Sequence, residues 1–230
     1  MKGTEAFQEL IPLLKDQPVV HANGYICRES FQLQDREANF YMIGSMGLAS
    51  SIGLGVALCR PDKKVIIFDG DGNVLMSMGT LAMIAATAPK NLVHIVFDNQ
   101  VYESTGSQRS LSGSVPLEEV ARSSGYPVAL KVSKKEEVKP AFEKLMNGDG
   151  PGFLLIKVDP VFDPETGRVT HTPEEIKTIN FSQLSLPWWV KDDGNGYASL
   201  LNKDGATLAV GVQSETADVI IKIINSYEIK

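Results

Sequence analysis

The stretch VIIFDGDGN, residues 65–73, joins four consecutive apolar residues to a polar segment that contains two glycines. Unbroken apolar runs of this kind are typical of central parallel strands, because both faces of such a strand are covered. A second run, LVHIVFDN at 92–99, has the same form and ends in Asp98 and Asn99. Residues 74–88, between the two runs, are expected to form one helix. The repetition predicts a β–α–β unit and therefore a parallel sheet.

The same alternation extends over most of the chain. Further strands are expected at 18–20, 40–43, 128–132 and 153–158, and helices at 4–16, 48–59, 117–123 and 135–146. The predicted fold class is α/β, with a doubly wound, mostly parallel sheet. Ligands bind beyond the carboxyl ends of the strands in such sheets. Polar loops follow several predicted strands and should gather at that edge, at 21–24, 44–47, 69–73 and 98–106.

The last third of the chain has a different character. A polar stretch rich in proline and threonine begins at Asp159 and is typical of a linker. Residues 197–212 alternate about a turn and predict a hairpin, and Ser214 is placed to cap a C-terminal helix. We therefore expect a ligand-binding domain over residues 1–185 and a small ββα appendage over 186–230.

The composition limits the possible partners and location. The chain has 230 residues, of which 43% are hydrophobic and 22% charged, as in ordinary globular proteins. Its net charge of −6 argues against nucleic acid or an anionic membrane surface as the main partner. No run approaches the ~20 apolar residues of a membrane span, and the first residues do not resemble a secretory signal. The cytoplasm is the expected compartment.

The segment GDGN at 70–73 has the residues for a phosphate site that includes a metal ion. Its glycines permit a tight turn, and the following helix would offer free N–H groups to a phosphate. Asp71 would repel a bare phosphate, so its position favours a bridging Mg²⁺. A calcium EF-hand is excluded because its sixth and twelfth positions would be Val74 and Thr80. The segment alone leaves an ordinary Asp-Gly turn as an equal alternative.

Asn99 follows Asp71 after one helix and one strand, at the end of the neighbouring strand. An amide oxygen there, together with the backbone carbonyl of Val101, would complete the shell of a metal ion. The two-part pattern resembles the motif of thiamine-diphosphate-dependent enzymes, in which Gly-Asp-Gly is followed by Asn-Asn. Asp98 stands where that family has its first asparagine, and the second, ligating asparagine is in place. The resemblance implies thiamine diphosphate and Mg²⁺ as cofactors, with the metal bound by Asp71, Asn99 and Val101.

A second segment, GSMG at 44–47, matches the Gly-x-hydrophobe-Gly sequence of the same family. The resemblance implies that Met46 wedges between the cofactor rings and enforces a bent conformation. The carbonyl of Gly44 would then face the exocyclic amine, which can remove the proton of the thiazolium carbon. Asn23 and Gly24 fall where relatives touch the diphosphate, although a simple turn is an equal alternative. The residues expected to bind cofactor are Asn23, Gly24, Gly44, Ser45, Met46, Gly70, Asp71, Gly72, Asn73, Asn99 and Val101.

Between residues 19 and 160 the sequence most resembles the branch of phosphonopyruvate decarboxylases and sulfopyruvate decarboxylase β subunits. The loop YESTGSQ at 102–108 is closer to the phosphonopyruvate form. The resemblance places Thr105 on the substrate side of the thiazolium, with Ser104 and Gln108 as further donors. A solvated loop is an equal alternative. Gly44, Met46 and Thr105 are the residues expected to act in catalysis.

The implied reaction is decarboxylation of a small anionic 2-oxoacid, 3-phosphonopyruvate to phosphonoacetaldehyde and CO₂, or 3-sulfopyruvate. Activation in relatives requires a glutamate on a pyrimidine domain. Few residues precede the first predicted strand, so we expect a separate subunit to supply that domain in a hetero-oligomer, docked on the small-residue helix 48–59. Two alternatives stay open: a subunit of another two-subunit thiamine enzyme, such as an acetolactate-synthase-like one, and a non-catalytic cofactor-binding or regulatory subunit.

Overall fold

A computed structural model describes residues 1–160 and 165–176 in full and, beyond them, the backbone of segments 189–192, 197–201 and 207–213. The chain divides into two compact units, Met1–Asn180 and Phe181–Lys230. The first unit carries the predicted site residues. The predicted domain boundary at 185/186 stays a prediction.

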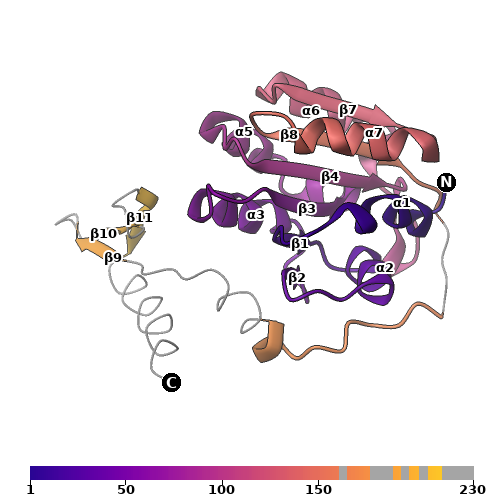
Figure 1. Cartoon of the computed structure of the whole chain (residues 1–230), viewed down its shortest axis with the longest axis horizontal. Coiled ribbons are helices and arrows are strands. Elements are labelled where there is room, and N and C mark those ends of the chain that lie inside the picture. Colours follow the sequence, from indigo (N-terminus) through magenta and orange to yellow (C-terminus); the bar gives the residue numbers. More distant parts are fainter. Residues whose placement is uncertain (161–164, 177–188, 193–196, 202–206, 214–230) are drawn as a thin grey trace. The chain divides into compact units, whose positions relative to one another are not determined.

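The first unit is built on one sheet of six parallel strands in the order β2-β1-β3-β4-β8-β7 (Figure 1). The strands are β1 Val19–His21, β2 Asn39–Tyr41, β3 Val65–Gly70, β4 Leu92–Asp98, β7 Val128–Val132 and β8 Gly152–Lys157. The two apolar runs form the central strands β3 and β4, as expected. From β1 the chain moves outward to β2, whereas from β3 it moves the other way to β4. The switch point between β1 and β3 is where sheets of this kind bind ligands.

Helices cover both faces of the sheet. One face carries α3 Ala49–Cys59, α5 Gly79–Thr87 and α6 Leu117–Ser124, and the other carries α1 Gly3–Leu10 and α7 Lys135–Met146. Successive residues of β3 alternate between the two cores: Val65 and Ile67 pack on the first, and Ile66 and Phe68 on the second. This two-sided burial confirms the doubly wound α/β class. Among the described residues, no helix has the length and apolar character needed to cross a bilayer.

The single helix predicted over 74–88 is wrong, because two helices occupy this region. α4, Asp71–Met76, begins at the acidic residue itself, and α5 begins at Gly79. The chain leaves helical geometry at Ser77, where φ is −135° and ψ is 43°. The loop that contains Gly47 packs against this break, since a Cβ at Gly47 would lie 2.7 Å from Ser77 Oγ. The interruption thus brings the two glycine motifs together.

The second unit contains an antiparallel sheet in the order β11-β10-β9. Its strands are β9 Trp189–Asp192, β10 Tyr197–Leu201 and β11 Thr207–Gln213. The predicted hairpin over 197–212 corresponds to β10 and β11, which pair antiparallel. β9 is an additional strand that the sequence did not predict. The helix expected after Ser214 lies outside the described residues.

Candidate functional site

A pocket lies at the carboxyl edge of the sheet, at the switch point. It is formed by the ends of β1, β3 and β4, the first turn of α2 (Tyr25–Leu33) and the start of α4. Most of the predicted site residues line it: Asn23, Gly24, Met46, Gly70, Asp71, Gly72, Asn73, Asn99, Val101 and Thr105. Gly44 and Ser45 do not line the pocket; both are exposed, and Ser45 has a positive φ of 53°.

The two glycines of the GDG segment have different surroundings. A Cβ on Gly72 would lie 2.6 Å from Tyr102 Cε1 and 3.0 Å from the methyl group of Met46. A larger residue would therefore displace the Tyr102 ring. Gly70 is extended, with φ −115°, and a Cβ there would come no closer than 3.7 Å to Asn73 Nδ2. Only the second glycine is required by the packing of the chain itself.

Asn73 connects the two glycine motifs. Its Oδ1 accepts a buried hydrogen bond of 2.8 Å from the backbone N–H of Gly47. Gly47 has φ +94°, a conformation that favours glycine. The bond fixes the loop that carries Met46 against α4, so Met46 is held beside Gly72 at the pocket wall.

The carboxylate of Asp71 is buried and is held by hydroxyl groups from a distant loop. Ser112 Oγ lies 2.9 Å from Asp71 Oδ2, and Ser110 Oγ donates to the same oxygen. Burial raises the pKa of Asp71, and the nearby charge of Asp98 raises it further, although the serine hydrogen bonds act in the opposite direction. A desolvated carboxylate of this kind is stabilised by a cation.

The amide of Asn99 is oriented by two hydrogen bonds. Its Oδ1 accepts from the backbone N–H of Val101 at 3.0 Å, and its Nδ2 donates to Glu103 Oε2 at 3.1 Å. Because a backbone N–H can only donate, the first bond assigns the amide oxygen to that side. Burial raises the pKa of Glu103, and the charge of Asp71 adds to this effect. The sequence did not predict Glu103, which also lines the pocket.

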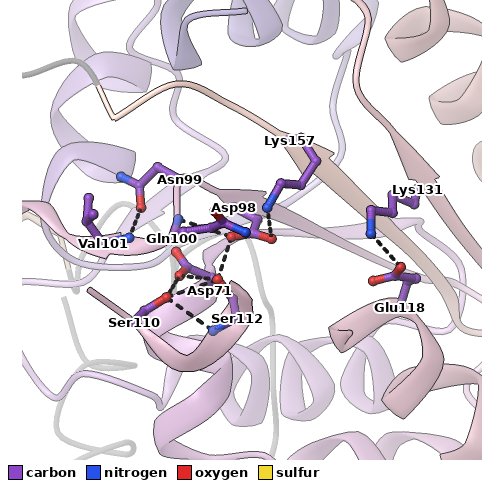
Figure 2. Close-up of polar contacts among 10 residues, drawn as sticks. All are labelled: Asp71, Asp98, Asn99, Gln100, Val101, Ser110, Ser112, Glu118, Lys131 and Lys157. Atoms are coloured by element: carbon purple, nitrogen blue, oxygen red, sulfur yellow. Dashed lines mark hydrogen bonds and ion pairs between the residues drawn. The ribbon is translucent and has the colours of Figure 1, made fainter. Parts of the chain in front are cut away.

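A second set of polar contacts lies behind Asp71 and is drawn in Figure 2. Ser112 Oγ is 2.7 Å from Asp98 Oδ1, and Lys157 Nζ is 2.7 Å from Asp98 Oδ2. Ser110, Ser112 and Lys157 were not predicted, because isolated serines in a loop and a lysine at a strand end give no signal in the sequence. Together they connect the end of β8 to the predicted metal ligand.

The charges around the pocket suit a metal-bridged anion better than a bare one. Four acidic residues line it and no Lys, Arg or His of the described residues does; the acids are Glu29, Asp71, Glu103 and Asp159. Within the described part of the chain, no group of three His, Cys, Asp or Glu side chains could hold a metal by itself. A metal here would therefore take one carboxylate, amide and carbonyl oxygens, and oxygens of the ligand.

Asn23 adds an observation that fits a bound group. Its Oδ1 is buried and has no hydrogen-bond partner among the described residues. Buried polar groups are rarely left unsatisfied. Gly24, the N-cap residue of α2, follows at the pocket wall and has a φ of +89°. The pocket thus holds an unused amide oxygen near the acidic residues.

An α/β sheet with an acidic, oxygen-rich pocket at its switch point defines a cofactor-binding domain. Residues 22–158 match the family described as "Thiamine pyrophosphate enzyme, C-terminal TPP binding domain". The match covers more than half of the chain and includes every predicted site residue. The chain belongs to this family.

Within the family, two kinds of relatives are found. Phosphonopyruvate decarboxylase of Streptomyces viridochromogenes is 42% identical over 167 residues, which cover 73% of this chain and 42% of that protein. Sulfopyruvate decarboxylase subunit beta of Methanothermobacter thermautotrophicus is 38% identical over 160 residues, covering 70% of this chain and 83% of that subunit. The chain therefore spans less than half the length of the first relative and most of the second.

The fold also resembles a solved structure. Benzoylformate decarboxylase from Polynucleobacter necessarius superposes with a TM-score of 0.62 at 16% identity, covering 71% of this chain and 34% of that chain. At this identity the likeness concerns the fold alone. It agrees with the parallel sheet described above.

Proposed function

We propose that the chain is the diphosphate-binding subunit of a thiamine-diphosphate- and Mg²⁺-dependent decarboxylase that acts in the cytoplasm on 3-phosphonopyruvate or 3-sulfopyruvate. The observation that carries the proposal is that Asp71 and Asn99, from adjacent strand ends, line one pocket in a chain of the TPP-binding family. The names of the relatives support this substrate class.

In this proposal Asp71, Asn99 and the carbonyl of Val101 hold Mg²⁺, which in turn holds the diphosphate. The acidic lining and the absence of a basic side chain among the described lining residues support a bridging cation. Gly70, Gly72, Asn73, Asn23 and Gly24 surround the diphosphate. When bound, thiamine diphosphate supplies the electron sink for loss of CO₂.

The remaining predicted residues act on the cofactor rings and the substrate. Met46, fixed beside Gly72, would support the cofactor rings. The carbonyl of Gly44 would face the aminopyrimidine, and Ser45 would bind the cofactor next to it. Thr105 Oγ1 donates to Gln108 Oε1 at 3.0 Å, and Gln108 Nε2 donates to the Thr105 carbonyl at 2.9 Å. This exposed pair is a candidate to contact the substrate anion.

We also propose a partner subunit with a pyrimidine domain that supplies the activating glutamate, in a hetero-oligomer. The pocket lined by Asp71 and Asn99 encloses only about 100 Å³, whereas small-molecule sites typically enclose about 300–1,000 Å³. Apolar side chains next to the site are exposed, among them Ile43 at 65%, Leu48 at 46% and Met76 at 61%. Both observations support a second protein surface over the pocket.

The test is release of CO₂ from phosphonopyruvate and from sulfopyruvate, measured with the full chain alone and with a candidate pyrimidine-domain subunit from the same genome. We expect turnover only with the partner, thiamine diphosphate and Mg²⁺, and loss of turnover in Asp71→Asn. Full activity of the chain alone would contradict the two-subunit proposal. Cofactor binding by the complex without CO₂ release from either acid would instead indicate a non-catalytic subunit.

A further inference from the structure

We propose that Lys157 is a positioning residue for the metal site: by pairing with Asp98, it holds Asp98 and Ser112 in place and so keeps the Asp71 carboxylate directed toward the metal. The inference rests on the proposed function, since that function assigns a metal to Asp71. It concerns a lysine that does not line the cofactor pocket.

The first step is the ion pair between Asp98 and Lys157. The two residues are register partners at the ends of the parallel neighbours β4 and β8. Their charged atoms are 2.7 Å apart, and their side chains are 3% and 27% exposed, respectively. A pair fixed by strand register and mostly shielded from water is stronger than an ordinary surface pair.

The second step is the hydroxyl group that Asp98 shares with Asp71. Ser112 Oγ lies 2.7 Å from Asp98 Oδ1 and 2.9 Å from Asp71 Oδ2. Figure 2 draws both contacts. A serine carries one hydroxyl hydrogen and can donate to only one of these oxygens at a time. Ser110, which is 2.9 Å from Ser112, supplies the other hydroxyl hydrogen bond to Asp71. Two buried carboxylates are therefore separated by a single hydroxyl group.

The third step is the charge balance. Two buried carboxylates this close repel each other, and this repulsion would tend to move them apart. Lys157 offsets the charge of Asp98, so the pair as a whole is neutral, as an asparagine amide at position 98 would be. This accounts for the acid at a position where the thiamine-diphosphate motif has asparagine. Of these two buried aspartates, only Asp71 then brings an unbalanced negative charge to the metal.

The test uses the full chain in complex with its candidate pyrimidine-domain subunit, with Mn²⁺ as the metal probe and millimolar thiamine diphosphate, and measures free Mn²⁺ by electron paramagnetic resonance. Lys157→Met should weaken Mn²⁺ binding by about tenfold or more, the usual effect of losing a group behind a metal ligand. The double variant Asp98→Asn/Lys157→Met should recover affinity to within about threefold of wild type, because an amide oxygen at position 98 can accept from Ser112 without a cation beside it. Thermal unfolding of each variant separates loss of affinity from loss of fold.

The ion pair of Lys131 with Glu118 provides a matched control, because its charged atoms are 2.8 Å apart and its acid is also largely buried. Lys131→Met should leave Mn²⁺ binding unchanged. Wild-type affinity in Lys157→Met, a double variant as weak as the single one, or an equal loss in Lys131→Met would each overturn the inference while the proposed function stands. If the wild-type complex shows no Mn²⁺ site that depends on Asp71, the proposed function fails and this inference with it.

Discussion

Gly72 is the residue at which the backbone, the pocket wall and the Met46 loop meet most closely. Gly72→Ala would push the Tyr102 ring, so we expect a loss of about 1–3 kcal/mol in the free energy of unfolding. Gly70→Ala has room for its Cβ, with the nearest atom 3.7 Å away, and should change stability by no more than about 0.5 kcal/mol. Urea unfolding of the metal-free variants measures both. An equal loss at the two positions would contradict the described packing.

His21 makes the stability of the fold sensitive to acid. The ring is fully buried, with Nε2 2.8 Å from Ser30 Oγ, and burial lowers its pKa from 6.5 to about 3. Between these values the unfolded chain binds the proton and the folded chain does not, so stability falls as the pH falls. Lowering the pH from 7 to 5 should therefore reduce the free energy of unfolding by about 2 kcal/mol through this group.

His21→Gln should remove that contribution. The free energy of unfolding, measured in urea at pH 7 and at pH 5, should therefore fall by about 2 kcal/mol less in the variant than in wild type. The contribution of the carboxylates is the same in both proteins, so it cancels when the two changes in the free energy of unfolding are compared. Identical slopes would show that His21 does not titrate as described.

At the residue scale, the sequence predicted those site residues that belong to a short, local motif. The glycines and acids of GDGN, and Asn99 one strand later, follow apolar runs whose ends can be read directly. Ser112 and Lys157 could not be found in this way, because they lie 41 positions from Asp71 and 59 positions from Asp98, respectively. Lys157 meets Asp98 because β8 lies next to β4, and Ser112 meets Asp71 because the turn at 111–113 packs against α4. A sequence pattern specifies neither arrangement.

At the scale of elements, α3 presents two glycines in opposite situations. A Cβ on Gly53 would lie 2.4 Å from Cγ1 of Ile67 in the sheet, whereas a Cβ on Gly55 would meet nothing within 4 Å. Gly53→Ala should therefore destabilise the chain by about 1–3 kcal/mol. Gly55→Ala should stabilise it by about 0.5–1 kcal/mol, because alanine is the better helix former. Thermal unfolding of the pair decides this, and a stabilising Gly53→Ala would contradict the close approach of α3 to β3.

The helices and strands with the clearest hydrophobic pattern were predicted most accurately. β3 and β4 are continuous apolar runs, and α7 and β7 lie exactly where their periodicity places them, over 135–146 and 128–132. The break between α4 and α5 was missed because MSMGTLAMIA contains no proline and no charge. It depends on a tertiary contact with the Gly47 loop, which local sequence does not reveal.

At the scale of the whole molecule, the proposed enzyme has a second subunit over the pocket. Gly55 lies on the exposed side of α3, so Gly55→Arg should leave the fold intact but block docking. We expect its complex with the partner to dissociate on size-exclusion chromatography, with CO₂ release reduced by about tenfold or more. Lys131→Arg, on β7, serves as the control. A Gly55→Arg complex as stable and active as wild type would show that α3 is not part of the interface.

The central claim is that one metal ion joins Asp71 and Asn99 to the diphosphate. A crystal structure of the full chain with its partner, thiamine diphosphate and Mn²⁺ tests it directly through the anomalous signal of the metal. We expect one ion about 2–2.3 Å from a carboxylate oxygen of Asp71 and from Oδ1 of Asn99, with diphosphate oxygens in its shell. An ion bound elsewhere, or a diphosphate held without either residue, would contradict it.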